Sequence, residues 1–255
     1  MLDPNPDAAH GGAKLAAAGI AFEHGLMEIE ARELNIGFVS RMTRGRPWVR
    51  MKIAATLDGR TALAAGPNAG RSQWITGPEA REDGHRWRAR ACAILTGIGT
   101  VKADDPRLTV REIAATRQPL RVIVDSRLET PDNARILEGG GALIFCAVES
   151  GKKLNAEIQK LPNPYGKVAL PKMLEELARR GINEVHVEAG FRLNGSLLRE
   201  GCVDEFLIYL NPSLLGDEAQ GMVDLPGIDD LEKRPKLKIQ SLDRIGDDIR
   251  ILARL

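Results

Sequence analysis

The sequence has few cysteines, few aromatic residues, no long apolar run and no excess of charge of either sign. Its three cysteines, Cys92, Cys146 and Cys202, are widely spaced and set among apolar residues. This pattern fits buried, reduced thiols in a reducing compartment better than a disulfide framework. No stretch approaches the ~18 consecutive apolar residues of a membrane-spanning helix, and the N-terminus lacks the pattern of a secretory signal peptide. We therefore expect a cytoplasmic protein that does not enter a membrane.

The charges are balanced, with 36 Lys and Arg residues against 35 Asp and Glu residues and a net charge of +1. This balance argues against a nucleic-acid or acidic-membrane partner held by bulk electrostatics, so any basic site must be local. The four histidines share no ligand spacing with the cysteines, and no metal site is expected. With 255 residues, 43% of them hydrophobic, the chain is long enough for one large domain and an appendage.

The first part of the chain is expected to form a small separate unit. Its pattern predicts a short Ala-rich helix, a strand over residues 20–23, and an amphipathic helix with an apolar side made of Leu26, Ile29, Leu34 and Phe38. This piece is too small to make a core alone. The charged segment 43–47 contains both Gly and Pro and predicts a linker, so we place a domain boundary between residues 1–45 and residues 46–255.

Beyond this boundary, short apolar runs alternate with helical patterns. The predicted strands are residues 49–54, 92–96, 120–125, 142–146, 184–188, 205–210, 236–245 and 248–253. The predicted helices are residues 78–90, 172–180 and 193–200. Such alternation is typical of an α/β layered fold with a largely parallel sheet, and the last two strands, joined through Gly246 and Asp247, predict an antiparallel hairpin at its edge.

Two candidate segments follow predicted strands, where open α/β sheets place their ligands. The strand that contains Lys52 ends in small residues, which would let a flat ligand approach, and then turns at Asp58 and Gly59. A later strand ends at Glu188 and turns at Gly190 into a helix, which suits a dinucleotide phosphate. Glu188 would hold ribose hydroxyls or relay a proton there. The alternative for each segment is a purely structural turn.

A third candidate segment, residues 72–111, combines a serine, several arginines and a helix start. Thr76 is the predicted N-cap, with Pro78 and Glu79 in the first turn. Gly97 and Gly99 lack the third glycine of a dinucleotide-binding fingerprint, so they predict a flexible loop that is either structural or placed against a pyrophosphate.

The arginines of this segment divide into two groups. Backbone N–H groups and guanidinium forks together bind the oxygens of a phosphate monoester, which makes Arg88 and Arg111 candidates. Arg86 and Arg90 are expected to be solvated surface charges. Only the resemblance described next separates Arg88 and Arg111 from that alternative.

Motifs such as KIAATLDGR, SQWIT, LTGIGT and ADDPRLTVR occur in a fixed order along the chain. With residues 122–126, 187–190 and 214–216, they resemble the reductase domain of the bacterial riboflavin-biosynthesis deaminase/reductase family, formally 5-amino-6-(5-phosphoribosylamino)uracil reductase. The resemblance covers residues 46–255. It implies a fold similar to dihydrofolate reductase, with a mixed, largely parallel sheet and flanking helices. It also implies a homodimer, for which only the apolar region 206–215 offers support in the sequence.

The resemblance further implies hydride transfer from NADPH to the C1 carbon of the ribosyl group of a phosphorylated ribosylaminopyrimidine. By resemblance, Lys52 and Glu188 are the catalytic residues. The implied NADPH-binding residues are Ala54, Trp74, Thr100, Asp104, Ser126, Gly190, Phe191, Arg192, Leu193, Asn194, Gly195 and Ser196. The implied substrate-binding residues are Ser72, Arg88, Leu108, Arg111 and Glu188. Preference for NADPH over NADH is read only from the position of Ser126 and Arg127 near the adenosine ribose.

Two features depart from the family pattern. Residues 1–45 resemble only the end of the cytidine-deaminase-like domain, without the His-x-Glu and Pro-Cys-x-x-Cys zinc motifs, so deaminase activity is not expected. Residues 66–71 form a longer loop than the family usually has before Ser72, which either alters the lid of the cleft or is only surface.

Two competing functions remain open at this point. A dihydrofolate-reductase-like enzyme with another pteridine or pyrimidine substrate would keep the NADPH segments and relax Ser72, Arg88 and Arg111. A non-catalytic nucleotide-binding remnant would have no need of Lys52 and Glu188. All five residues are present, which favours the reductase.

Overall fold

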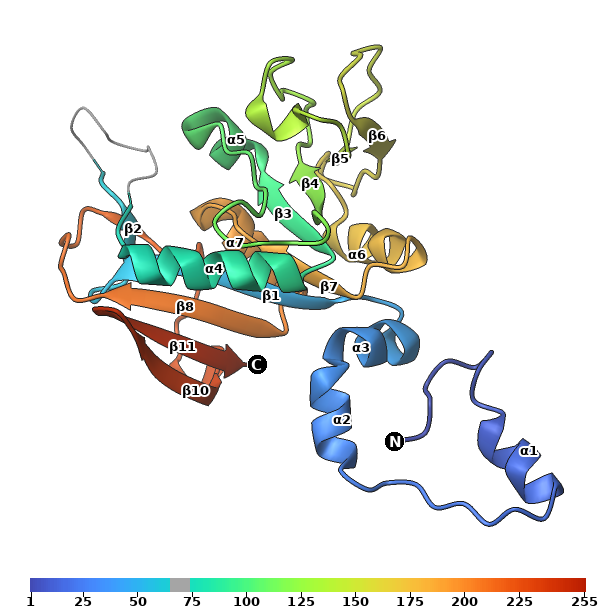
Figure 1. The fold of residues 1–255 in the computed structure, drawn as a ribbon. Helices are drawn as coiled ribbons and strands as arrows, with labels where there is room; N and C mark the ends of the chain where they lie inside the picture. The colour runs from blue at the N-terminus through green and yellow to red at the C-terminus, as the bar shows by residue number, and fades with distance from the viewer. Residues whose placement is uncertain (65–73) are drawn as a thin grey trace.

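The computed structural model describes residues 1–64 and 74–255, and Figure 1 shows their fold. The helices are α1 (Gly11–Ala17), α2 (Glu28–Leu34), α3 (Ile36–Arg44), α4 (Pro78–Arg90), α5 (Ile98–Asp104), α6 (Leu170–Arg179) and α7 (Phe191–Arg199). The strands are β1 (Trp48–Thr56), β2 (Arg60–Ala62), β3 (Ala93–Gly97), β4 (Leu120–Val124), β5 (Ala142–Cys146), β6 (Glu157–Lys160), β7 (Glu184–Val187), β8 (Glu205–Asn211), β9 (Gln220–Gly221), β10 (Lys238–Ile245) and β11 (Asp248–Arg254).

Most of these strands form one mixed sheet. Within the described residues its order is β10-β11-β8-β1-β7-β3-β4-β5-β6, and β2 pairs separately with β9. The strands from β8 to β6 are parallel to one another, whereas β11 is antiparallel to both β8 and β10. The predicted α/β fold with a largely parallel sheet and an antiparallel hairpin at its edge is therefore confirmed. Gly246, with φ of 62°, makes the hairpin turn.

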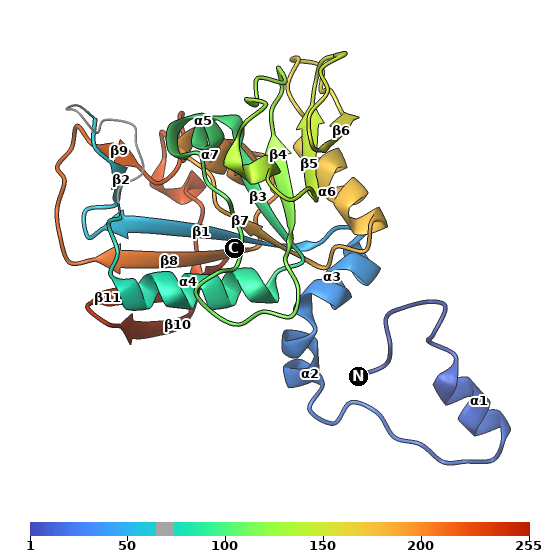
Figure 2. The ribbon, with the colours of Figure 1, turned by 45° about the horizontal axis from the view of Figure 1, so that its top comes forward.

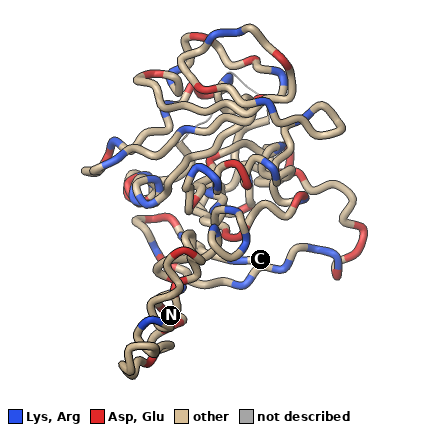
Figure 3. The backbone as a smooth tube through the Cα atoms, turned by 90° about the vertical axis from the view of Figure 1, so that its right-hand side faces the viewer, with Lys and Arg blue, Asp and Glu red and all other residues tan. Residues whose placement is uncertain are grey.

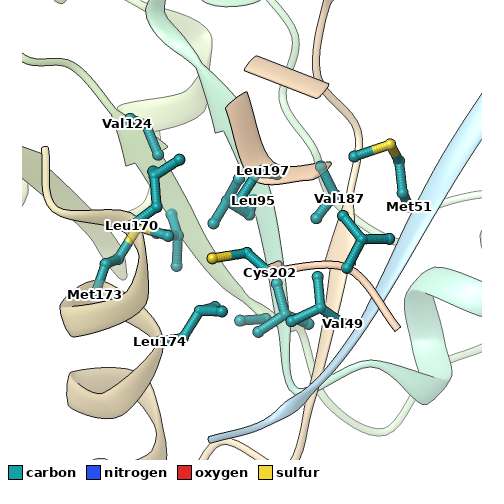
Figure 4. Close-up of a cluster of buried hydrophobic side chains, with 14 of the residues drawn as sticks. Val49, Met51, Leu95, Val124, Leu170, Met173, Leu174, Val187, Leu197 and Cys202 are labelled. Atoms are coloured by element: carbon teal, nitrogen blue, oxygen red, sulfur yellow. The ribbon is translucent and has the colours of Figure 1, made fainter. Parts of the chain in front are cut away.

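Alternate residues of the parallel strands build the larger core on one face of the sheet. Val49 and Met51 of β1, Leu95 of β3 and Val187 of β7 are fully buried there. Helices α6 and α7 cover this face, and Figure 4 shows their apolar side chains meeting those of the strands. Burial on this scale contributes about 25 cal/mol per Å² of apolar surface, which fixes the register of β1 against β7 and β8.

The other face of the sheet carries α4 and α5. Val101 of α5 packs with Ile94 and Ile123 of β3 and β4, and Ala80 of α4 packs with Leu207 and Tyr209 of β8. Figure 2 shows α4 running along β8 and β1. The polar residues Lys52, His186 and Glu188 alternate with the larger core along β1 and β7, so they face this side, next to α4.

The N-terminal segment differs from its prediction. No strand forms over residues 20–23, and the predicted amphipathic helix is two helices, α2 and α3, separated at Asn35. No residue of α1 or α2 is buried, and Figures 1 and 2 show α1 lying apart from the sheet. A strand at residues 20–23 has no neighbouring strand to pair with in this structure, so its apolar pattern has no ladder to join.

Several local predictions need correction as well. Gly77, not Thr76, is the N-cap of α4, and it makes no side-chain cap. The glycine pair Gly97 and Gly99 does not form a flexible loop, because Gly97 ends β3 and Gly99 lies inside α5. The helix expected near Leu193 begins two residues earlier, directly after Gly190. Residues 66–71 lie outside the described residues.

Candidate active site

The side chains singled out in the sequence largely converge on one cavity of about 1570 Å³. It lies at the carboxyl ends of β3 and β7 and beside β1, where an open parallel sheet places its ligands. The cavity exceeds the roughly 300–1,000 Å³ of a pocket for one small molecule, so it has room for two. The predicted residues that line it are Lys52, Ala54, Trp74, Arg88, Thr100, Asp104, Leu108, Arg111, Glu188, Gly190, Phe191, Arg192, Leu193 and Asn194.

The centre of the cavity wall is a bidentate ion pair between α4 and the end of β7. Arg88 donates from Nε to Oε1 of Glu188 at 2.5 Å and from Nη2 to Oε2 at 2.8 Å. Its third nitrogen, Nη1, donates to the carbonyl oxygen of Thr109 at 3.1 Å. Burial alone would raise the pKa of Glu188, but the charge and hydrogen bonds of Arg88, with a contribution from His186, hold this pKa well below its usual value. Glu188 is therefore ionised at neutral pH.

Lys52 lies beside this pair on β1. Burial lowers the pKa of its ammonium group, the Glu188 carboxylate opposes this shift, and Arg88 adds to it. Its Nζ lies 5.8 Å from the centroid of the Tyr209 ring, within reach of a cation–π contact. The site thus places an amine of lowered pKa next to a carboxylate that stays charged. Such a combination can donate a proton and orient a hydroxyl group.

The loop after α5 forms the side of the cavity next to α4. Leu108 is 3% exposed with φ of 48°, so its side chain anchors the loop inward while the backbone turns. Arg111, later in the same loop, also lines the cavity. Burial is the largest cause that lowers the pKa of its guanidinium group, and the charge of Arg88 lowers this pKa further. Both predicted substrate-binding residues of this loop therefore reach the cavity that Arg88 and Glu188 line.

The opposite side of the cavity is made by the start of α7 and by α5. Gly190 is the N-cap of α7 and provides no side-chain cap, so the first backbone N–H groups of this helix have no side-chain acceptor in the part of the chain that the structure describes. Asn194 is 3% exposed, and its Oδ1 has no hydrogen-bond partner among the described residues. A Cβ atom on Gly190 would lie 3.6 Å from Oγ1 of Thr100, which brings α5 and α7 together here. This side suits an anionic ligand with a polar group near Asn194.

Three of the predicted cofactor residues do not line the cavity. The hydroxyl of Ser126 accepts a hydrogen bond from the backbone N–H of Val168. Gly195 packs against the backbone of Asp224, and Ser196 donates to the carbonyl oxygen of Arg192 within α7. Trp74 lines the cavity but is 77% exposed. Ser72 lies outside the described residues.

The structure adds cavity residues that sequence reasoning missed. Arg60, Arg107 and Arg135 line the cavity, as does the segment 219–223 next to β9. No local pattern marks residues 219–223, because they reach the site only by pairing with β2 across more than 150 positions of sequence. Sequence reasoning missed Arg135 for a similar reason. Its backbone N–H donates to Oδ1 of Asp105 at 2.8 Å, and these two residues lie on opposite sides of β4 in the sequence.

No group of His, Cys, Asp and Glu side chains that could hold a metal ion occurs within residues 1–64 and 74–255. In the same ranges, no helix is both long and apolar enough to cross a bilayer. All three cysteines are free thiols.

Comparison with known proteins gives consistent matches. A family model described as the RibD C-terminal domain matches residues 47–251. The riboflavin biosynthesis protein RibD of Escherichia coli K12 is 40% identical over 265 residues, which cover 98% of this chain and 71% of that protein. The solved structure of Acinetobacter baumannii RibD, form 1, has a TM-score of 0.86 at 36% identity and covers 99% of this chain and 70% of that one.

A second solved structure carries a more specific name. It is a diaminohydroxyphosphoribosylaminopyrimidine deaminase/5-amino-6-(5-phosphoribosylamino)uracil reductase from Thermotoga maritima, with a TM-score of 0.83 at 27% identity. It is covered over 69% of its length, and 99% of this chain takes part in the match. The chain therefore belongs to the RibD family of riboflavin biosynthesis proteins, and residues 47–251 are its RibD C-terminal domain.

Proposed function

We propose that this chain is an NADPH-dependent 5-amino-6-(5-phosphoribosylamino)uracil reductase, which converts the ribosyl group of its substrate to a ribityl chain. The observation that carries the proposal is the ionised Glu188, clamped by Arg88 and adjacent to Lys52, in a cavity that also contains the uncapped start of α7. The name of the Thermotoga maritima relative supports the substrate. The NADPH cofactor and the particular reduction are parts of this proposal.

The residues on the α7 side fit a nicotinamide dinucleotide. The free N–H groups at the start of α7 suit a pyrophosphate, and the orphaned Oδ1 of Asn194 is an acceptor for an amide or hydroxyl donor. Thr100, Asp104 and Ala54 complete this part of the wall. When bound, NADPH would supply the hydride that reduces the ribosyl carbon.

The chain's own residues would manage the proton. Reduction at C1 opens the ring and leaves a negative charge on the ring oxygen, which must be protonated. Lys52 is the donor in this proposal, because a lowered pKa makes its ammonium group a better acid. Glu188 stays ionised, so it accepts hydrogen bonds from ribose hydroxyls and holds the ring against Lys52.

The substrate phosphate would lie near the loop after α5. All three guanidinium nitrogens of Arg88 already donate hydrogen bonds within the protein. Arg88 would therefore attract the phosphate by its charge and not by a free pair of N–H donors. Arg111 is the candidate for direct charge-assisted hydrogen bonds. Ser72 remains a candidate from the resemblance alone.

The proposal extends to the rest of the chain in three respects. Residues 1–45 would be the end of a deaminase-like domain, and residues 46–255 the reductase. The protein would work in the cytoplasm, where its free thiols stay reduced. It would also be a homodimer.

Only part of the region expected to support the dimer is available to a partner. Phe206, Leu207 and Tyr209 are buried within the chain's own sheet, whereas Leu214 is 71% exposed. The edge of the sheet is more suitable, because Ile239 and Leu242 of β10 are 58% and 62% exposed. Light scattering should give twice the chain mass, and Leu242→Glu should give the mass of a single chain; one chain mass for the unaltered protein would refute the dimer.

The test of the activity is consumption of NADPH, followed by its absorbance, with the deaminated phosphoribosylaminopyrimidine as substrate. The expected result is saturation in both compounds. Binding of both compounds without any reduction would favour the non-catalytic alternative.

A further inference from the structure

A buried histidine behind the cavity wall connects the two arginines expected at the substrate phosphate. His85 lies on α4, one turn before Arg88, and is 4% exposed. Its Nδ1 accepts a hydrogen bond from the backbone N–H of Arg111 at 3.3 Å. Its Nε2 lies 3.5 Å from Nη1 of Arg88 and 3.4 Å from Oε1 of Glu112. Neither the residues of the sequence nor the family resemblance singled out His85 for a role at the site.

These contacts define the protonation state of the ring. Because Nδ1 accepts from Arg111, it carries no proton, so the neutral ring must carry its proton on Nε2. The Nε2–H group then lies 3.4 Å from a carboxylate oxygen of Glu112, whose negative charge it faces, and Arg88 donates elsewhere, to the carbonyl oxygen of Thr109. A doubly protonated ring would lose the bond from Arg111 and place a third cation beside Arg88 and Arg111.

The electrostatic surroundings oppose that second proton. Burial is the largest cause that lowers the pKa of His85, and the charges of Arg88 on α4 and Arg111 on the loop lower it further. Glu112 on the loop and Glu188 at the end of β7 act in the opposite direction. The result is a pKa of about 4, so the ring is neutral at physiological pH.

The other contacts of the loop after α5 explain why the hydrogen bond between His85 and Arg111 determines the position of Arg111. Leu108 is buried, and the side chain of Gln118 pairs with both the N–H and the carbonyl oxygen of Val110. The bond to His85 therefore immobilises the next residue, Arg111, at the point where its side chain leaves the loop. Loss of this bond frees the backbone of Arg111 while the preceding residues stay anchored.

We infer that His85 is a positioning residue for the substrate's anionic group, acting as a neutral Nε2–H imidazole that fixes Arg111 relative to Arg88. The inference rests on the proposed function in one respect: Arg111 is taken to meet the substrate phosphate. His85 touches no substrate itself, since it lies behind the cavity residues. Its removal should weaken phosphate binding and leave cofactor binding and the chemical step intact.

Two variants separate positioning from simple packing. In His85→Asn, an amide oxygen takes the place of Nδ1 and preserves the acceptor, whereas in His85→Gln the amide lies where Nε2 was and the acceptor for Arg111 is lost. For His85→Gln we expect KM for the phosphoribosyl substrate to rise about 3- to 10-fold, the size of one lost neutral hydrogen bond, with KM for NADPH and kcat within about 2-fold. For His85→Asn we expect KM to stay within about 2-fold. Equal KM values for the two variants would overturn the inference.

A second measurement needs no turnover. In ¹⁵N-histidine-labelled protein without ligands, the resonances of His85 should show an unprotonated Nδ1 and a protonated Nε2, with no titration from about pH 8 down to about pH 5. An Nδ1–H tautomer, or titration near the ordinary value, would overturn the inference whether or not the protein reduces the substrate. If the protein shows no reductase activity, calorimetric affinity for ribose 5-phosphate replaces KM, and equal affinities of the two variants would again count against His85.

Discussion

Glu188 shows how one side chain links the sheet to the cavity. It follows the last residue of β7, both of its oxygens bind Arg88, and one of them lies 3.4 Å from Nε2 of the buried His186. A carboxylate held in this way is fixed in orientation and in charge. Its neighbour Lys52 depends on that charge, because Glu188 opposes the effect of burial on the pKa of Lys52.

The first prediction concerns this carboxylate. Glu188→Gln should lower kcat about 100-fold, because Lys52 loses the charge that opposes the effect of burial on its pKa and the ribose hydroxyls lose a charged acceptor. The measurement is the steady-state rate of NADPH oxidation. Glu184→Gln is the matched control, since Glu184 pairs with Arg50 and Arg90 at the other end of β7, away from the cavity. Equal kcat in Glu188→Gln and the unaltered protein would remove Glu188 from the mechanism.

The second prediction concerns the phosphate. Arg111→Ala should raise KM for the phosphoribosyl substrate about 10- to 100-fold, because a lost charge-assisted hydrogen bond costs about 1.5–3 kcal/mol. Arg107→Ala is the control, because Arg107 also lines the cavity but is paired with Glu138. Its KM should change by less than about 3-fold, in line with an exposed ion pair. Similar effects of both substitutions would mean that only general positive charge matters.

Glu188 was predictable from the residues, because a charge and a glycine follow its strand, and Lys52 lies on a strand that ends in small residues. Arg88 and Arg111 were separated from surface arginines only by the family resemblance. All four line the cavity, and their roles are part of the proposal. His85 was not recognised as part of the site. The available signal was its position three residues before Arg88 on a helix, which puts both side chains on one face.

At the scale of elements, the position of α7 depends on a close approach of backbones. A Cβ atom on Gly195 would lie 2.2 Å from the carbonyl oxygen of Asp224. Asn194 also donates from Nδ2 to the carbonyl oxygen of Met222 at 3.2 Å, so α7 is held against residues 222–224. Because Met222 lines the cavity, this contact connects packing with the expected cofactor side.

The third prediction follows from that contact. Gly195→Ala should lower the free energy of unfolding by about 1–3 kcal/mol, because either α7 or residues 222–224 must move. It should also raise KM for NADPH. Gly84→Ala is the control: Gly84 lies inside α4 with nothing within 4 Å of the added Cβ, so helix propensity should raise the free energy of unfolding by about 0.5–1 kcal/mol. Denaturant titration measures the free energy of unfolding of both variants. If Gly195→Ala left this free energy unchanged, the packing argument would be contradicted.

Elements with strong periodicity were predicted best. Helix α4 and strand β5 agree with their predicted ranges, because turn residues and apolar runs bound them sharply. The pair β2 and β9 was missed, since a two-residue strand has no period and its partner is distant in the sequence. The false strand at residues 20–23 shows the converse, a local apolar pattern without any partner.

At the scale of the whole molecule, charges of both signs are distributed along the chain, as Figure 3 shows, and the net charge is +1. Acid sensitivity should therefore depend more on buried groups than on net repulsion. Burial lowers the pKa of both His85 and His186. Between about pH 6.5 and about pH 4, the unfolded chain binds more protons at His85 than the folded protein does, and the lowered pKa of His186 acts in the same direction, so the free energy of unfolding decreases as the pH falls.

The fourth prediction tests this dependence. The urea midpoint should be lower at about pH 5.5 than at about pH 7.5, and His85→Asn should show a smaller difference, because it removes one of the two imidazoles. Because the pKa of Glu188 is lowered in the folded protein, its protonation should decrease the free energy of unfolding further only below the usual glutamate pKa, about 4.5. An identical pH dependence in His85→Asn and the unaltered protein would show that His85 is not a neutral buried base.

The claim that one cavity brings a reduced nicotinamide to a ribosyl carbon is tested most directly by mixing the protein with NADPH and 5-amino-6-(5-phosphoribosylamino)uracil and following the absorbance of NADPH. The account predicts that one NADPH is oxidised for each substrate molecule reduced. It also predicts a rate that saturates with the concentration of NADPH and with that of the substrate. A rate no greater than that without protein would contradict it.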